Sequence, residues 1–163
     1  MQSIGDLCQA LPVASFDAGA VLLQEGQKTG RLFVLIEGEV EVLKSGHGGD
    51  FQINLVADYG AIFGDMSALL NIPHMATVRA VSAVRAHVIE GGDAFLQTHQ
   101  EIAYLLSKLL AQRLHGVTTY LVDLKQQFED QSNHLGMVDE ILETLVHDQR
   151  REFTPGSDRD PDY

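Results

Sequence analysis

The stretch AIFGDMSALLNIPHMATV, residues 61–78, decides how the rest of the chain is interpreted. It follows strand-like sequence, turns at Gly64, continues for about one helical turn, breaks at Pro73 and resumes as a strand. Gly64 has no Cβ and therefore permits close backbone approach. The residues after it predict a short helix with free N–H groups at its start, and such amides form an anion site. Asp65 is an acceptor suited to a sugar hydroxyl.

The sequence on both sides predicts short strands separated by glycine turns. Residues 31–38 are almost wholly apolar, which indicates a strand buried on both faces. Residues 39–44 and 51–56 alternate between apolar and polar, as half-exposed strands do, and residues 45–50 form the hairpin loop between them. The other predicted strands are residues 20–27, 76–81 and 84–90. Short strands at this spacing favour a β-sandwich or barrel.

The two ends of the chain predict helices. Residues 1–15 form an amphipathic helical lead that stops at Pro12. After Gly92, Asp93 is suited to cap a helix. Apolar residues then recur alternately every four and three positions, at Leu110, Leu114, Val117, Leu121, Leu124 and Phe128, and in the same phase at Leu135, Val138, Leu142 and Leu145.

This repeat predicts a coiled-coil seam of about five heptads and a homodimer through residues 110–145. The alternative is an amphipathic helix folded back on its own domain, which needs a wider apolar stripe. Helix breakers in residues 132–136 also permit a helical hairpin at that point. The orientation of the two helices in the dimer is open.

The order Phe-Gly-acid-hydrophobic-Ser, then Leu-Leu, Pro and Ala-Thr-Val, resembles the phosphate-binding cassette of cyclic nucleotide-binding domains. That family includes the bacterial catabolite activator protein and the regulatory subunit of protein kinase A, and the resemblance covers residues 21–114. It implies a mainly β fold with helices: an eight-stranded jelly roll (a double-stranded β-helix) over residues 16–92. A short N-terminal helix, a cassette helix across one end of the roll and a long C-terminal dimerisation helix within residues 93–149 complete it.

The resemblance also implies a ligand, cAMP or cGMP, and a set of ligand-binding residues. Ribose and phosphate would meet Phe63, Gly64, Asp65, Met66 and Ser67. His74 and Met75 stand where the family has its phosphate-binding arginine and the residue after it, and Thr118 and Thr119 would reach over the base. The structural alternatives are a plain elbow in a roll without ligand, a solvated loop histidine, and threonines packed at the edge of the seam.

Three positions depart from the family pattern. Asp65 replaces a glutamate, His74 replaces the arginine, and Met75 replaces a small or hydroxylic residue. Arginine offers a permanently charged, bidentate partner, whereas histidine is largely neutral at pH 7. A charged hydrogen bond contributes about 1.5–3 kcal/mol, so its loss predicts about ten- to a hundredfold weaker binding.

Composition and charge exclude several other classes of function. The chain has 163 residues and a net charge of −12, and neither half holds the concentrated basic surface that direct DNA binding needs. Cys8 is the single cysteine, so an internal disulfide is excluded, and no apolar run approaches the ~20 residues that cross a membrane. No catalytic constellation and no metal-ligand spacing stands out. Residues 150–163 are predicted to be a disordered acidic tail.

The sequence therefore predicts a cytoplasmic, non-enzymatic, dimeric sensor of the cyclic nucleotide-binding type. Ligand would order residues 64–70, and the change would pass through the C-terminal helices to a protein partner. One alternative is a ligand-free dimeric interaction scaffold with a degenerate pocket. Another is a Crp/Fnr-like transcription regulator that lacks its own DNA-binding domain.

Overall fold

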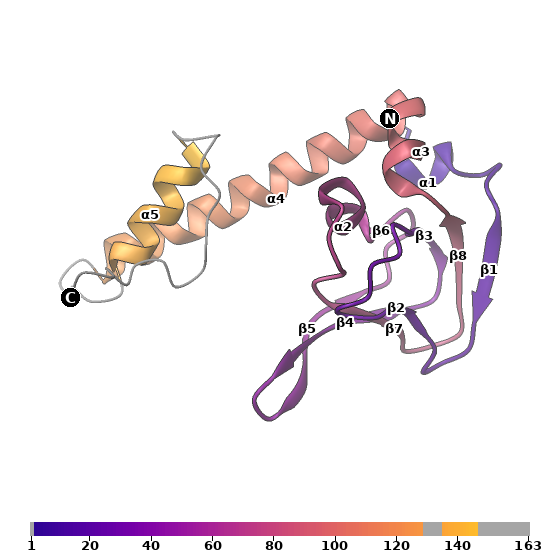
Figure 1. Ribbon diagram of the computed structural model, residues 1–163, viewed down its shortest axis with the longest axis horizontal. Helices are drawn as coiled ribbons and strands as arrows, with labels where there is room; N and C mark the ends of the chain where they lie inside the picture. The colour runs from indigo at the N-terminus through magenta and orange to yellow at the C-terminus, as the bar shows by residue number, and fades with distance from the viewer. Residues whose placement is uncertain (1, 129–134, 147–163) are drawn as a thin grey trace. The chain divides into compact units, whose positions relative to one another are not determined.

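A computed structural model describes residues 2–128 and 135–146 (Figure 1). The chain divides after Leu106 into two compact units. The predicted acidic tail, residues 150–163, lies outside the described residues.

The first unit contains two four-stranded antiparallel sheets, with strand orders β1-β8-β3-β6 and β2-β7-β4-β5 (Figure 1). The strands are β1 (Val13–Phe16), β2 (Val21–Leu23), β3 (Leu32–Glu37), β4 (Val40–Gly46), β5 (Gly49–Val56), β6 (Ile62–Phe63), β7 (Thr77–Ala80) and β8 (Val84–Ile89). The helices are α1 (Ile4–Leu7), α2 (Asp65–Leu70), α3 (Gly92–Thr98) and the beginning of α4 (Gln100–Gln127). The predicted eight-stranded, mainly β fold with helices is confirmed.

The apolar run predicted to be buried on both faces is β3. Its first four residues, from Leu32 to Leu35, are all at most 2% exposed. Phe33 and Leu35 belong to the core cluster, and the Phe33 ring meets the Phe16 ring edge-on at 5.7 Å. Leu32 lies beside Gly92 at the start of α3, where an added Cβ would come within 2.6 Å of its Cγ. Successive residues of β3 point to opposite faces of the sheet and therefore pack against different neighbours.

Several boundaries differ from the sequence prediction. Strand β1 begins at Val13, before residue 16, because residues 13–16 pair with β8 and so belong to the roll. The hairpin loop is shorter than residues 45–50, since β4 continues to Gly46 and β5 begins at Gly49. The N-cap of α3 is Gly91, with φ +59°, and Asp93 lies in the first turn instead.

The second unit contains the rest of α4 and α5 (Leu135–Val146). Lys125 on α4 and Asp139 on α5 form an ion pair. Residues 14 apart in sequence would lie about 21 Å apart along one helix, so the chain reverses between the two helices. The predicted seam thus does not run as one continuous helix, and the helical hairpin is the form observed. Dimerisation through residues 110–145 stays a prediction.

Candidate ligand-binding site

The residue on which the cassette turns is Gly64. It follows β6 with φ +84° and is the N-cap of α2. A Cβ at this position would lie 2.3 Å from the carbonyl oxygen of Arg31 and 3.2 Å from Cδ1 of Leu23. Both the backbone conformation and the close approach therefore require glycine. The start of α2 has no side-chain cap, so its first amides are not occupied by a capping side chain.

Helix α2 ends earlier than predicted, at Leu70, and not at Pro73. Asn71 adopts the left-handed conformation with φ +55°, which asparagine tolerates, and its N–H donates to the Ala68 carbonyl at 3.3 Å. The Ile72 N–H donates to the Ser67 carbonyl at 3.0 Å. Asn71 therefore ends the helix before the proline can.

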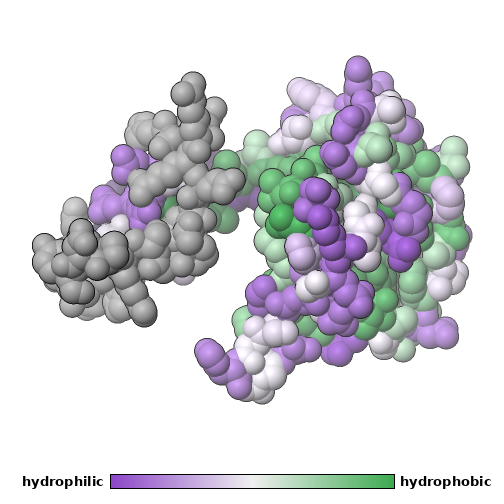
Figure 2. All heavy atoms as spheres, in the orientation of Figure 1, coloured by the Kyte–Doolittle hydropathy of each residue, from purple (hydrophilic) through white to green (hydrophobic). Residues whose placement is uncertain are grey.

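The predicted site residues divide into buried and exposed groups. Phe63, Asp65 and Ser67 are 5–8% exposed, and Asp65 has interactions of its own. Met66 and Met75 are 43% and 41% exposed. Figure 2 shows hydrophobic surface around α2, and the large apolar residues exposed on this helix are Met66, Leu69 and Leu70. Helix α2 thus buries Asp65, Ser67 and Ala68 and exposes its large apolar side chains.

His74 is buried at 4% exposure and is held by a hydroxyl on each side. Its Nδ1 lies 2.7 Å from Ser67 Oγ, and its Nε2 lies 2.7 Å from Thr29 Oγ1. Ser67 donates its one hydroxyl proton to the Gly64 carbonyl at 3.1 Å, so the proton between Ser67 and His74 must come from Nδ1. Nε2 then accepts from Thr29, whose oxygen accepts the Arg31 N–H at 3.2 Å.

This Thr29–His74–Ser67 chain joins the β2–β3 loop, the cassette exit and α2. Burial, and to a smaller extent the nearby charge of Arg31, lower the pKa of His74, so the ring is neutral at pH 7. The structural alternative of a solvated loop histidine is wrong, because the ring lies inside and both of its nitrogens are engaged. Thr29 was not a predicted site residue, since nothing in its sequence surroundings shows a contact 45 residues away.

Residues 13–101 match the cyclic nucleotide-binding domain family over more than half of the chain. The chain belongs to the cyclic nucleotide-binding domain family. A CRP-like cAMP-activated global transcriptional regulator of Mycobacterium tuberculosis is 26% identical over 125 residues, which are 75% of this chain and 55% of that protein. A cAMP-dependent protein kinase regulatory subunit of Mycosarcoma maydis is 29% identical over 77 residues, 47% of this chain and 14% of that protein.

The fold is also similar to that of solved members. The catabolite activator protein of Thermus thermophilus superposes with a TM-score of 0.64 at 20% identity, over 94% of this chain and 87% of that chain. The two curated relatives are regulatory proteins by name, and the chain spans between 14% and 55% of their lengths. Residues 13–101 thus form a cyclic nucleotide-binding domain, and its fold is shared with the catabolite activator protein.

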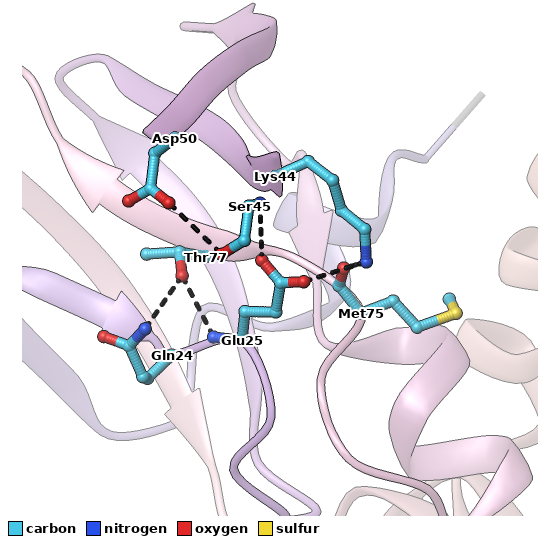
Figure 3. A network of polar contacts seen from close by, with 7 residues as sticks. All are labelled: Gln24, Glu25, Lys44, Ser45, Asp50, Met75 and Thr77. Carbon is cyan, nitrogen blue, oxygen red and sulfur yellow. Dashed lines mark hydrogen bonds and ion pairs between the residues drawn. The ribbon is translucent and has the colours of Figure 1, made fainter. Parts of the chain in front are cut away.

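A second polar network fixes the exit of the cassette in this cyclic nucleotide-binding domain (Figure 3). Thr77 Oγ1 accepts from the Glu25 N–H at 3.0 Å. The Glu25 carboxylate pairs with Lys44 Nζ at 3.0 Å and accepts the Ser45 N–H at 2.9 Å, and these contacts lower the pKa of Glu25. Lys44 also donates to the Met75 carbonyl at 2.5 Å. Residues of β4 and β7 and of the segment after β2 therefore hold Met75 in place.

Thr118 and Thr119 lie on the part of α4 that belongs to the second unit. Their hydroxyls donate to the carbonyls one turn earlier, of Leu114 at 2.8 Å and His115 at 2.9 Å. These are ordinary contacts for threonine inside a helix. A role over the base of a nucleotide stays a prediction for both residues.

A metal centre and a membrane-spanning helix are both absent from the described residues. Residues 2–128 and 135–146 contain no group of three or more histidine, cysteine or acidic side chains able to hold a metal ion. Within the part of the chain that the structure describes, no helix is both long and apolar enough to cross a membrane.

Proposed function

We propose that this domain is a non-catalytic, cyclic nucleotide-responsive regulatory module. The phosphate of cAMP or cGMP would bind at the start of α2, and the ribose would meet Asp65. The occupied cassette would then bias the helices that follow the roll, and through them a protein partner. The cytoplasm, where cyclic nucleotides act as signals, is the compartment that fits this role.

The observation that supports this proposal most strongly is the glycine-led turn into an uncapped helix. Gly64 brings the backbone against Arg31, and no side chain caps α2. Asp65, one residue further on, is 5% exposed and lies at the position that the resemblance assigns to the ribose. Amides for the phosphate and an acceptor for the sugar thus occur in neighbouring residues.

A route from the cassette to the helices is also present within the first unit. Helix α2 contacts α3. The Gly92 N–H at the start of α3 donates to the Gly30 carbonyl at 2.7 Å, and Gly30 follows Thr29, which bonds His74. A shift of the cassette therefore has a short path to α3, as a two-state switch requires.

Dimerisation is the second part of the proposal. The apolar side chains of Leu114, Val117 and Phe128 are 45%, 51% and 45% exposed in the single chain. They lie at seam positions of the sequence repeat, and a second copy would cover them. Sedimentation analysis with Val117→Asp tests this, and we expect the variant to be monomeric where the wild type is a dimer.

Titration calorimetry with cAMP and with cGMP tests the ligand. We expect saturable binding that Asp65→Ala weakens and that the exposed control Asp58→Ala leaves unchanged. We also expect His74→Arg to tighten binding about ten- to a hundredfold, because it restores a charged bidentate donor. Equal weakening by Asp58→Ala would contradict the assignment of Asp65.

A ligand-free interaction scaffold is the second candidate function. The buried His74, with both ring nitrogens bonded within the protein, favours it, because the cassette is held without a ligand. Calorimetric silence toward both nucleotides, in the wild type and in His74→Arg, would select the scaffold over the sensor.

A further inference from the structure

We infer that Arg31, immediately before β3, supplies the permanent positive charge that meets the ligand phosphate in this domain. The inference rests on the proposed binding of cyclic nucleotide at the cassette. It names the specificity-determining residue that compensates for the histidine at position 74.

His74 itself is a poor partner for a phosphate. Its Nδ1–H donates to Ser67 and its Nε2 accepts from Thr29, so the ring has no free donor. An anion that recruited this ring would have to break the Thr29–His74–Ser67 chain inside the protein. The charge must therefore come from another residue near the cassette.

Arg31 is linked to the cassette by its backbone and by its charge. Its carbonyl oxygen would be 2.3 Å from a Cβ on Gly64, so its backbone packs on the turn. Its N–H donates to Thr29 Oγ1, which is bonded to His74. Its charge reaches far enough to lower the pKa of His74. Arg31 itself precedes β3, and its side chain is placed by its pair with Glu90, which follows β8.

The guanidinium of Arg31 is available to a ligand. Its Nε donates to Glu90 Oε1 at 2.8 Å, and the two side chains are 39% and 67% exposed. Ion pairs this exposed are weak, so a phosphate can displace the carboxylate. Within residues 2–128 and 135–146 the pair with Glu90 is the one hydrogen bond or ion pair recorded for this guanidinium. Arginine has five N–H donors in a fork that matches phosphate.

Lys44 is one competing cation near the cassette, and its contacts argue against it. Its ammonium group donates to the Met75 carbonyl and pairs with Glu25, which is 21% exposed. Both contacts hold the cassette exit in place. A phosphate that bound Lys44 would break both of these contacts, whereas a phosphate that bound Arg31 would break only its exposed ion pair with Glu90.

The choice of Arg31 also has a consequence for signalling. Glu90 directly precedes Gly91, the N-cap of α3. When phosphate takes the guanidinium, Glu90 loses its partner at the point where the chain enters α3. Ligand binding would therefore change the electrostatics of this helix start without any contact between ligand and helix.

The same pair of strands contains a matched control. Arg85 and Glu37 face each other on β8 and β3 and pair at 3.5 Å, with side chains 49% and 61% exposed. Calorimetry with cAMP and cGMP should show Arg31→Gln weakening binding about ten- to a hundredfold, and Arg85→Gln by less than about twofold. Glu90→Gln should strengthen binding up to about fivefold, and its control Glu37→Gln should not. Thermal melts must show that all four variants fold.

Failure of the inference is distinguishable from failure of the proposed function. If the wild type binds and Arg31→Gln binds equally well, or if Lys44→Gln loses affinity and Arg31→Gln does not, the inference is wrong and the proposed function stands. If the wild type binds neither nucleotide, the proposed function is wrong. A titration with inorganic phosphate, followed by NMR of the backbone amides, then tests Arg31. Shifts at residues 64–67 that occur in the wild type and are lost in Arg31→Gln support the inference. Shifts that persist in Arg31→Gln, or no shifts in the wild type, overturn it.

Discussion

Replacing Ser67 by alanine removes the central hydroxyl of the Thr29–His74–Ser67 chain without adding volume. Ser67 is 5% exposed, accepts from His74 Nδ1 and donates to the Gly64 carbonyl. The variant leaves a buried ring N–H and a carbonyl without these partners. A buried donor without a partner costs about 1–3 kcal/mol, so we expect the free energy of unfolding to fall by about that amount. In a domain of this size each kcal/mol lowers Tm by about 4–8 °C.

Urea unfolding of Ser67→Ala beside Ser15→Ala measures this effect. Ser15 is an exposed serine of β1, so its substitution should change the free energy of unfolding by less than about 0.5 kcal/mol. Nitrogen-15 NMR of the His74 ring should show the proton on Nδ1 in the wild type. A loss in Ser67→Ala no larger than in Ser15→Ala, or a ring proton found on Nε2, would refute the assigned direction of the chain.

Three further outcomes are expected from stability and reactivity measurements. In urea unfolding, Gly64→Ala should lower the free energy of unfolding clearly more than Gly26→Ala. Both glycines have a positive φ (+84° and +86°), but only at residue 64 would a Cβ meet a backbone atom, at 2.3 Å. Equal losses of stability in the two variants would contradict this. Burial raises the pKa of the Cys8 thiol to about 11, so it should react with a thiol reagent at pH 8 only when the protein unfolds, and rapid native-state labelling would be inconsistent with it. The pKa of His74 in the folded protein lies below its ordinary 6.5, so the unfolded chain takes up a proton more readily than the folded one. The free energy of unfolding should therefore fall as the pH drops through 6.5 and should level off below the pKa of the folded state. This pH dependence should be absent in His74→Gln.

Local pattern was sufficient for most of the fold. The apolar run of β3, the existence of strands β4 and β5 and the Gly64 turn each depend on a few consecutive residues, and all three were predicted. The half-exposed pattern predicted for residues 51–56 is wrong, because the apolar side chains of Phe51, Ile53 and Leu55 on β5 are 51%, 54% and 48% exposed. Strand β1 was included in the helical lead, because residues 13–16 become a strand only by pairing with β8, about 70 residues later. The end of α4 at Gln127 was also open, since the heptad repeat continues in phase beyond it.

The site was predicted in part for the same reason. Gly64, Asp65 and Ser67 are neighbours in sequence, and the structure places them together at the start of α2. The surroundings of His74 depend on Thr29 and Arg31, which lie in the loop between β2 and β3, more than 40 residues earlier in the chain. A sequence pattern shows that a residue is a histidine, but not that two hydroxyls occupy its nitrogens.

We expect a cyclic nucleotide to bind at the start of α2 and to change the entry to α3. Titration of nitrogen-15-labelled protein with cAMP and cGMP, followed through the backbone amides, tests it most directly. We expect saturable shifts at residues 64–67 and, with the same midpoint, at residues 90–92. If the amide signals of residues 64–67 and 90–92 do not shift at nucleotide concentrations up to about 1 mM, this expectation is wrong.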